Sequence, residues 1–273
     1  MAEQNIYDNE AFFEGYHKLR ERDDNANVLF EMPALFSLLP ELKGKNVLDL
    51  GCGFGEHCMH MAQAGACKVV GIDISEKMLQ VARAENAAPN IVYYQMPMED
   101  ISRIEEYFDL VVSSLAFHYV EDFEGLIRDC HELLKPGGIL VFSQEHPFST
   151  CYGELSEGKE TESEGLRGKL PITLHCPENR WTRNAEGEKL YLNLAGYGLE
   201  GERESKWFVE GVKKYHRTFS TILNTLTAAG FVVEKTIEPL PTPELLAAHP
   251  EQADLFHKPD FLVIRARKKG TEA

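Results

Sequence analysis

The sequence lacks long hydrophobic runs and is poor in positive charge. No apolar stretch approaches the roughly 18 residues that a membrane-spanning helix needs, and segment 1–9 is too polar and acidic for a signal peptide. With 28 Lys and Arg against 44 Asp and Glu, the formal net charge is −16. Binding to nucleic acid depends on basic side chains at the phosphates, so this charge disfavours nucleic acid as the main partner. We therefore expect no membrane and no nucleic-acid partner.

The spacing of the cysteines indicates which kinds of disulfide and metal site to expect. The six cysteines show neither C-x-x-C spacing nor a disulfide-like rhythm, which indicates reduced thiols in a cytoplasmic protein. No cluster of three cysteines could hold an iron–sulfur centre. His57 and His60 lie three residues apart, but no other ligands are spaced to join them. We expect no metal site.

One stretch organises the remaining signals. An apolar run broken by Asp49 leads into glycines spaced G-x-G-x-G at positions 51, 53 and 55. This pattern predicts a buried strand, a tight loop and the start of a helix, which is a ligand-binding geometry in parallel α/β sheets. A dinucleotide fingerprint would need its third glycine at position 56, where Glu56 would repel a pyrophosphate. A nicotinamide-dependent oxidoreductase is therefore disfavoured.

The segment 48–55 resembles the first motif of class I S-adenosylmethionine (SAM) dependent methyltransferases, of the methyltransferase type 11 group that includes ubiquinone and menaquinone biosynthesis-like members. Asp73, at the end of the next apolar run, matches the acid that binds the ribose hydroxyls in that family. The cofactor-binding residues that the resemblance implies are Tyr16, Asp49, Gly51, Gly53, Gly55, Asp73, Ile74, Met78, Met98, Glu99 and Ser114. SAM would be the cofactor and S-adenosyl-L-homocysteine (SAH) its product.

The resemblance also implies the architecture. We predict an α/β, Rossmann-like, doubly wound sheet of seven mostly parallel strands in the order 3-2-1-4-5-7-6. An insertion of antiparallel strands would follow the fifth strand. Residues 1–40 would form a helical lid, residues 41–147 and 212–273 the SAM-binding domain, and residues 148–211 a substrate cover. Within the cover we expect strands at 190–199 and 207–215 and an acidic mobile loop at 153–164.

Candidates for acid–base chemistry are three histidines near predicted strand ends: His118, His146 and His216. We also expect His216 and Arg217 to contact the substrate. Methyl transfer from a sulfonium needs a base only when the acceptor carries a proton of high pKa, so the histidine assignment is weaker than the cofactor assignment. The predicted function is transfer of a methyl group to a small molecule through O, N or C, by a monomer or homodimer. The alternative is a catalytically silent SAM-binding regulatory protein.

Overall fold

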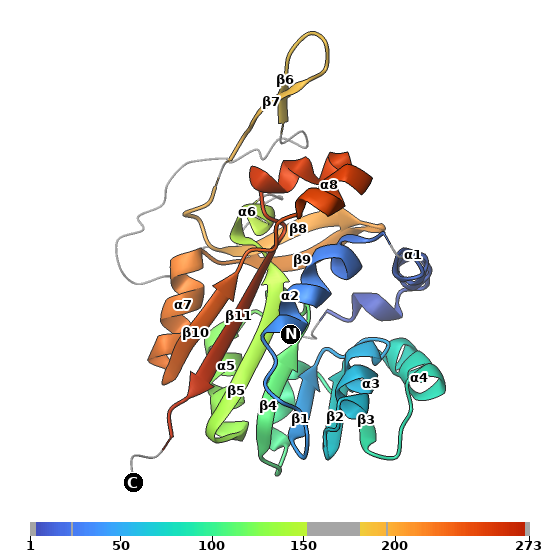
Figure 1. Ribbon diagram of the computed structural model, residues 1–273, viewed down its shortest axis with the longest axis vertical. Coiled ribbons are helices and arrows are strands. Elements are labelled where there is room, and N and C mark those ends of the chain that lie inside the picture. Colours follow the sequence, from blue (N-terminus) through green and yellow to red (C-terminus); the bar gives the residue numbers. More distant parts are fainter. Residues whose placement is uncertain (1–3, 23, 152–180, 195, 271–273) are drawn as a thin grey trace.

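The structure, a computed structural model, describes residues 4–22, 24–151, 181–194 and 196–270. A seven-stranded sheet runs through its centre in the order β3-β2-β1-β4-β5-β11-β10 (Figure 1). Strands β1 to β5 pair in parallel, and β11 pairs antiparallel with both β5 and β10. The seven strands are β1 (Asn46–Leu50), β2 (Lys68–Asp73), β3 (Ile91–Gln95), β4 (Phe108–Ser113), β5 (Leu134–Glu145), β10 (Phe231–Ile237) and β11 (Phe261–Lys268). The predicted order, 3-2-1-4-5-7-6, is confirmed.

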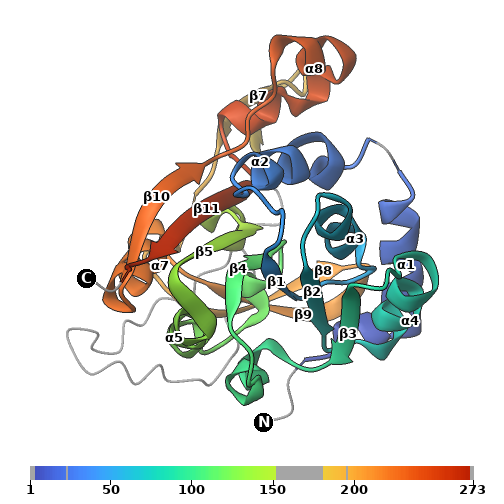
Figure 2. The ribbon, with the colours of Figure 1, turned by 60° about the horizontal axis from the view of Figure 1, so that its bottom comes forward.

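Alternating apolar residues bury both faces of the sheet. In β1, Leu48 and Leu50 point into one core and Val47 into the other. Helices α5 and α7 cover the first face, and α2 and α3 cover the second (Figure 2). The helices of the α/β layers are α2 (Met32–Ser37), α3 (Glu56–Gln63), α4 (Glu76–Glu85), α5 (Phe123–Leu133) and α7 (Phe219–Ala228). Of the helices that the structure describes, none exceeds 11 residues, so none has the length or apolar character to cross a bilayer.

Local signals in the sequence fix where several of these helices begin. Ser75 caps α4 by accepting the backbone N–H of Met78, and Thr218 caps α7 by accepting that of Thr221. Helix α3 begins directly after Gly55, whose φ of +79° is in the left-handed region. Because β1 and β2 are parallel, their carboxyl ends and the turns that lead into α3 and α4 lie at one edge of the sheet.

The N-terminal segment lies across that edge. It consists of the 3-10 turn η1 (Ile6–Asp8), helix α1 (Glu10–Arg20) and a π-helical turn η2 (Asn27–Glu31) that continues into α2. Asp8 accepts hydrogen bonds from the Ser75 hydroxyl and the Lys77 backbone N–H at the start of α4. The segment is thus bound to the helix that follows β2.

The region after β5 forms two hairpins, not the single pair of strands that we predicted. Strand β8 (Gly201–Trp207) pairs with β9 (Val209–His216), and β6 (Trp181–Arg183) pairs with β7 (Lys189–Leu192). Figure 1 shows β8 and β9 crossing above the central strands, with β6 and β7 projecting beyond them. The predicted partner strand 190–199 ends at Leu192, because the turn around Gly196 and Gly198 interrupts it. The predicted acidic loop at 153–164 lies outside the described residues.

The remaining short elements join these hairpins to the sheet. Helix α6 (Pro147–Thr150) follows β5, whereas α8 (Pro243–Ala248) and the 3-10 segment η5 (Pro250–Phe256) lie between β10 and β11. Lys189 forms an ion pair with Asp254, which joins β7 to η5.

Candidate active site

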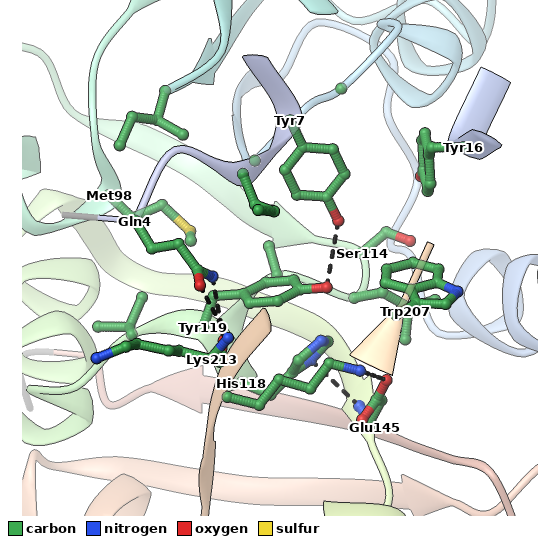
Figure 3. Close-up of a pocket in the computed structure, with 18 of the residues that line it drawn as sticks. Gln4, Tyr7, Tyr16, Met98, Ser114, His118, Tyr119, Glu145, Trp207 and Lys213 are labelled. Atoms are coloured by element: carbon green, nitrogen blue, oxygen red, sulfur yellow. Dashed lines mark hydrogen bonds and ion pairs between the residues drawn. The ribbon is translucent and has the colours of Figure 1, made fainter. Parts of the chain in front are cut away.

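A cavity of about 750 Å³ opens at the carboxyl ends of the central parallel strands. This size lies within the range of small-molecule binding sites. Residues from the ends of β1, β2, β4 and β5 form its floor, and the β8–β9 hairpin and the N-terminal segment form its cover. We call the part around Gly51, Gly53 and Asp73 the glycine half. We call the part around Tyr119 and Trp207, two side chains labelled in Figure 3, the hairpin half.

Two glycines bring bare backbone to the floor of the glycine half. Gly51 has φ +70° and Gly53 has φ +53°, conformations that favour glycine. A Cβ on Gly51 would lie 2.6 Å from the Cβ of Ala116, whereas a Cβ on Gly53 would meet nothing within 4 Å. Because Gly53 lines the cavity, a side chain there would occupy ligand space.

Asp73 is held in place by the same loop. One carboxylate oxygen accepts the backbone N–H of Gly53 at 2.9 Å, and the other accepts that of Ser75 at 2.8 Å. Burial raises the pKa of Asp73 to about 6, although these two N–H donors act in the opposite direction. An ionised carboxylate has about four acceptor positions, so acceptor capacity remains for a ligand diol. Asp73 lines the cavity, as the ribose-binding role requires.

Asp49 and Gly55 take other positions. Asp49 is buried and accepts a hydrogen bond from the Cys58 thiol at 3.1 Å, and burial raises its pKa to about 7. A Cβ on Gly55 would lie 2.3 Å from the hydroxyl oxygen of Tyr93. Neither residue lines the cavity, so both support the loop from beneath instead of facing a ligand.

Residues of α1 close the glycine half from above. Tyr16 and Arg20 line the cavity, and the Arg20 guanidinium forms an ion pair with Glu56. His57 also lines the cavity, and its buried Nε2 atom has no hydrogen-bond partner among the described residues. Burial lowers the pKa of His57 to about 3, so the ring is neutral at pH 7. A polar ligand would supply the missing partner, and with the open space over Gly53 this fits the amino-acid end of SAM.

The other predicted cofactor residues also reach the cavity: Ile74, Met78, Met98, Glu99 and Ser114. The Ser114 hydroxyl donates to Glu31 at 2.9 Å. Glu31 is 0% exposed, burial raises its pKa, and its second carboxylate oxygen has no partner among the described residues. We did not predict Glu31 from the sequence. The signal was a single acid within the apolar run 28–36, where an unpaired charge is costly.

The three histidines have different surroundings. His146 caps α6 through Nδ1, which accepts the Phe148 N–H, and its Nε2 lies 3.0 Å from a Glu238 oxygen. His216 is fully buried, with Nδ1 2.8 Å from the Thr150 hydroxyl and Nε2 2.8 Å from the Tyr197 carbonyl. Neither lines the cavity, because neighbouring groups occupy both ring nitrogens.

His118 does line the cavity. Its Nδ1 accepts the backbone N–H of Glu145 at 3.4 Å, so the neutral ring carries its proton on Nε2. Burial lowers the pKa of His118 to about 4, with the Glu145 carboxylate acting in the opposite direction. At neutral pH this tautomer favours a hydrogen-bond donor over a base. Arg217 donates to the backbone carbonyls of Val120 and Glu121 and does not line the cavity.

Aromatic and charged side chains fill the hairpin half. The Tyr7 hydroxyl donates to that of Tyr119 at 3.3 Å, which joins the N-terminal segment to the 3-10 turn η4 (Phe117–Tyr119) that follows β4 (Figure 3). Lys214, from β9, pairs with Glu145 at the end of β5 and lies beside the ring of Trp207. We did not predict Lys214, since nothing in the alternation of β9 distinguishes a cavity-facing lysine from a surface one.

The N-terminal segment joins the two halves. Gln4 donates to the backbone carbonyl of Lys213 at 3.2 Å and accepts the Lys213 N–H at 2.8 Å. Four residues later, Asp8 is bound to the start of α4 beside Asp73. Residues 4–8 therefore run from the β8–β9 hairpin to the glycine half, and Gln4, Ile6 and Tyr7 line the cavity on the way.

Comparisons with known proteins agree with this geometry. A family model described as a methyltransferase domain matches residues 48–142. The solved structure of an S-adenosylmethionine dependent methyltransferase from Mesorhizobium loti is 37% identical, with a TM-score of 0.72 over 90% of this chain and 99% of that chain. An uncharacterised protein from Haemophilus influenzae is 39% identical over 96% of both chains. A ubiquinone biosynthesis O-methyltransferase from Neisseria meningitidis is 38% identical over 107 residues, which cover 38% of this chain and 45% of that protein.

The chain belongs to the class I SAM-dependent methyltransferases, as the glycine loop and Asp73 led us to expect. The resemblance to the Mesorhizobium loti protein covers nine tenths of this chain. The resemblance to the Neisseria meningitidis enzyme covers less than half of either protein.

Proposed function

We propose that this methyltransferase transfers the methyl group of SAM to a small organic molecule bound in the hairpin half of the cavity. The observation that carries the proposal is the single cavity shared by the two halves, with the glycine loop at one side and Tyr119, Glu145 and Trp207 at the other. The net charge of −16 gives no surplus of basic side chains for a nucleic-acid backbone. A small molecule is therefore the acceptor that the site fits best.

In this proposal the glycine half holds the cofactor. Asp73 accepts hydrogen bonds from the ribose hydroxyls, and the bare backbone at Gly51 and Gly53 makes room for the methionyl group. Arg20 exchanges part of its ion pair with Glu56 for the methionyl carboxylate. Met98 and Glu99, at the start of a 3-10 turn after β3, border the adenine.

SAM supplies an activated methyl group on a positively charged sulfur. The protein mainly has to align the acceptor lone pair with the carbon–sulfur bond in a site that excludes water. Tyr7, Tyr16 and Trp207 wall the cavity for that purpose. His118 donates a hydrogen bond from Nε2 to the acceptor and so helps to hold it in line with the carbon–sulfur bond for in-line displacement. It does not remove a proton from the acceptor.

The test has two stages. Calorimetric titration with SAM, SAH and NAD should show binding of the first two and none of the third. Incubation with SAM and a low-molecular-mass metabolite extract should then release SAH. Binding of SAM without SAH release in any extract would contradict the proposal and favour a silent SAM-binding protein. Binding of NAD alone would contradict both.

A further inference from the structure

The hairpin half contains a buried ammonium group that is only partly satisfied. The Lys214 side chain is 12% exposed, and its Nζ lies 2.5 Å from one oxygen of Glu145. It also lies 5.1 Å from the ring centre of Trp207 and 6.0 Å from that of Tyr119. A lysine ammonium has three N–H donors, and among the described residues Lys214 uses one of them in a hydrogen bond. Two donors are thus left for a ligand.

A second ammonium lies on the same side of the cavity. Lys258, 17% exposed, donates to the Ser149 hydroxyl at 3.0 Å and to Asp260, and it lines the cavity together with Lys214. Both lysines act on the Glu145 carboxylate. The protein therefore already holds one carboxylate, its own, on the Lys214 ammonium and within the electrostatic reach of Lys258.

The alternative is a cationic ligand that binds the Glu145 carboxylate, and the surroundings of Glu145 disfavour it. A cationic ligand at Glu145 would have to compete with Lys214 and Lys258, which both stabilise its ionised form. Among the described residues, Glu145 is the carboxylate that Lys214 pairs with, so a ligand carboxylate would compete with Glu145 and could use the two remaining N–H donors. A buried N–H donor without an acceptor is costly. A ligand carboxylate that accepts from such a donor therefore gains more than it would at an exposed one.

The surrounding aromatic rings define the rest of the ligand. The rings of Tyr119 and Trp207 both lie near the Lys214 ammonium, and Tyr7, which lines the same cavity, is bound to Tyr119. Tyr7 is close enough to Asp73, and Tyr119 close enough to Glu145, for each carboxylate to help raise the pKa of its tyrosine. An acceptor anchored at Lys214 therefore lies against apolar ring surface and extends toward the cofactor side.

We propose that the methyl acceptor is a small organic acid whose carboxylate binds Lys214, with Lys258 beside it, and whose apolar body packs on Tyr119 and Trp207. This inference rests on the proposed function, since it names the class of acceptor for the same site. The carboxylate anchors the molecule, and the ring surfaces orient the remainder.

The test compares matched ligands on the SAH-saturated protein, by calorimetry. One series is indole-3-acetate, indole-3-acetamide and tryptamine, and a second is hexanoate, hexanamide and hexylamine. In at least one series the acid should bind about tenfold more tightly than the amide, the difference expected for a hydrogen bond to a charged group. Absence of acid preference in both series, or tightest binding of the amine, would overturn the inference. Failure of SAH itself to bind would instead overturn the proposed function.

Variants locate the effect. Lys214→Met should reduce acid binding to the level of the amide while SAH affinity stays unchanged. Lys235→Met, an exposed lysine on β10 away from the cavity, is the matched control and should keep the acid preference. Glu145→Gln, which removes the competing carboxylate, should tighten acid binding severalfold. Unchanged acid preference in Lys214→Met, or weaker acid binding in Glu145→Gln, would contradict the assignment of Lys214.

Discussion

The two halves of the cavity are built in different ways. In the glycine half, the important groups come from short segments that follow consecutive strands, and several are backbone atoms: the Gly53 N–H, the Ser75 N–H and the Ile72 carbonyl, which accepts the N–H groups of Gly51 and Cys52. In the hairpin half, side chains from distant parts of the chain meet: Gln4, Tyr7, Tyr119, Glu145, Lys214 and Lys258. A site made of backbone fits one constant ligand, whereas a site made of side chains can change its ligand by substitution.

This contrast means that substitutions in the glycine half should affect the binding of SAM, and those in the hairpin half the binding and turnover of the acceptor. The largest effect is expected at Asp73. Asp73→Ala removes two charge-assisted hydrogen bonds to the ribose, so SAM affinity should fall by about 100-fold or more, measured by calorimetry. Asp129→Ala is the control, because Asp129 lies on helix α5 and does not line the cavity; this variant should bind SAM normally. Equal SAM affinity in Asp73→Ala and the wild type would refute the ribose assignment.

A pair of glycine substitutions separates backbone strain from lost ligand space. Gly53 and Gly137 both have positive φ, and a Cβ on either meets nothing within 4 Å. Alanine at each should lower the free energy of unfolding by about 1 kcal/mol, because both positions are left-handed. Only Gly53→Ala should also weaken SAM binding, by about 30-fold, because its methyl group enters the cavity. A similar SAM affinity in the two variants would show that Gly53 does not face the cofactor.

The pH dependence of SAM binding should come from the glycine half. The folded-state pKa of Asp73 is about 6, raised from its ordinary value by burial, and the ionised form is the better acceptor for two hydroxyls. Protonation as the pH falls through 6 should therefore weaken binding, by about fourfold at pH 5.5 relative to pH 7.5. Titrations across this range should give a flat profile for Asp73→Asn. A profile that stays steep in that variant would assign the effect to another group.

The smallest effect is expected in the hairpin half, at His118. Since burial holds its pKa near 4 and its proton lies on Nε2, His118 is neutral throughout pH 5.5 to 8.5. His118→Phe should lower kcat/KM about threefold, the cost of one neutral hydrogen bond, and equally at every pH. The rate of SAH release with the active extract, compared between the variant and the wild type, measures this loss. An inflection near pH 6.5 in the wild type that disappears in His118→Phe would identify His118 as a base after all.

The sequence was informative where function depends on local pattern. The family was indicated by G-x-G-x-G with Asp73 one strand later, and the strand order followed from the resemblance to that family. The cap of α4 is also a local feature, since the Ser75 side chain accepts the N–H of Met78 three residues later. These features depend on a few neighbouring residues, so they can be predicted without knowing the tertiary structure.

Prediction was poorer where distant segments meet. The sequence does not distinguish a histidine that faces the cavity, such as His118, from those enclosed by their neighbours, His146 and His216. The pairing of β8 with β9 depends on the turn at Phe208, which has φ +60°, an uncommon conformation for a non-glycine residue. In the sequence, nothing distinguishes Lys214 from a surface lysine of a hairpin. It reaches the cavity because β9 passes close to the end of β5, where Lys214 meets Glu145. Which side chains reach the hairpin half is a property of the packing.

The segment formed by residues 4–8 has one consequence for kinetics. It is fastened to β9 through Gln4 and to α4 through Asp8, so it bridges the hairpin half and the glycine half of the cavity. A molecule leaving past this segment must break the same few hydrogen bonds, whichever half it comes from. The dissociation rates of the methyl donor and of the acceptor would then share one barrier, and a change at Gln4 would alter both residence times together.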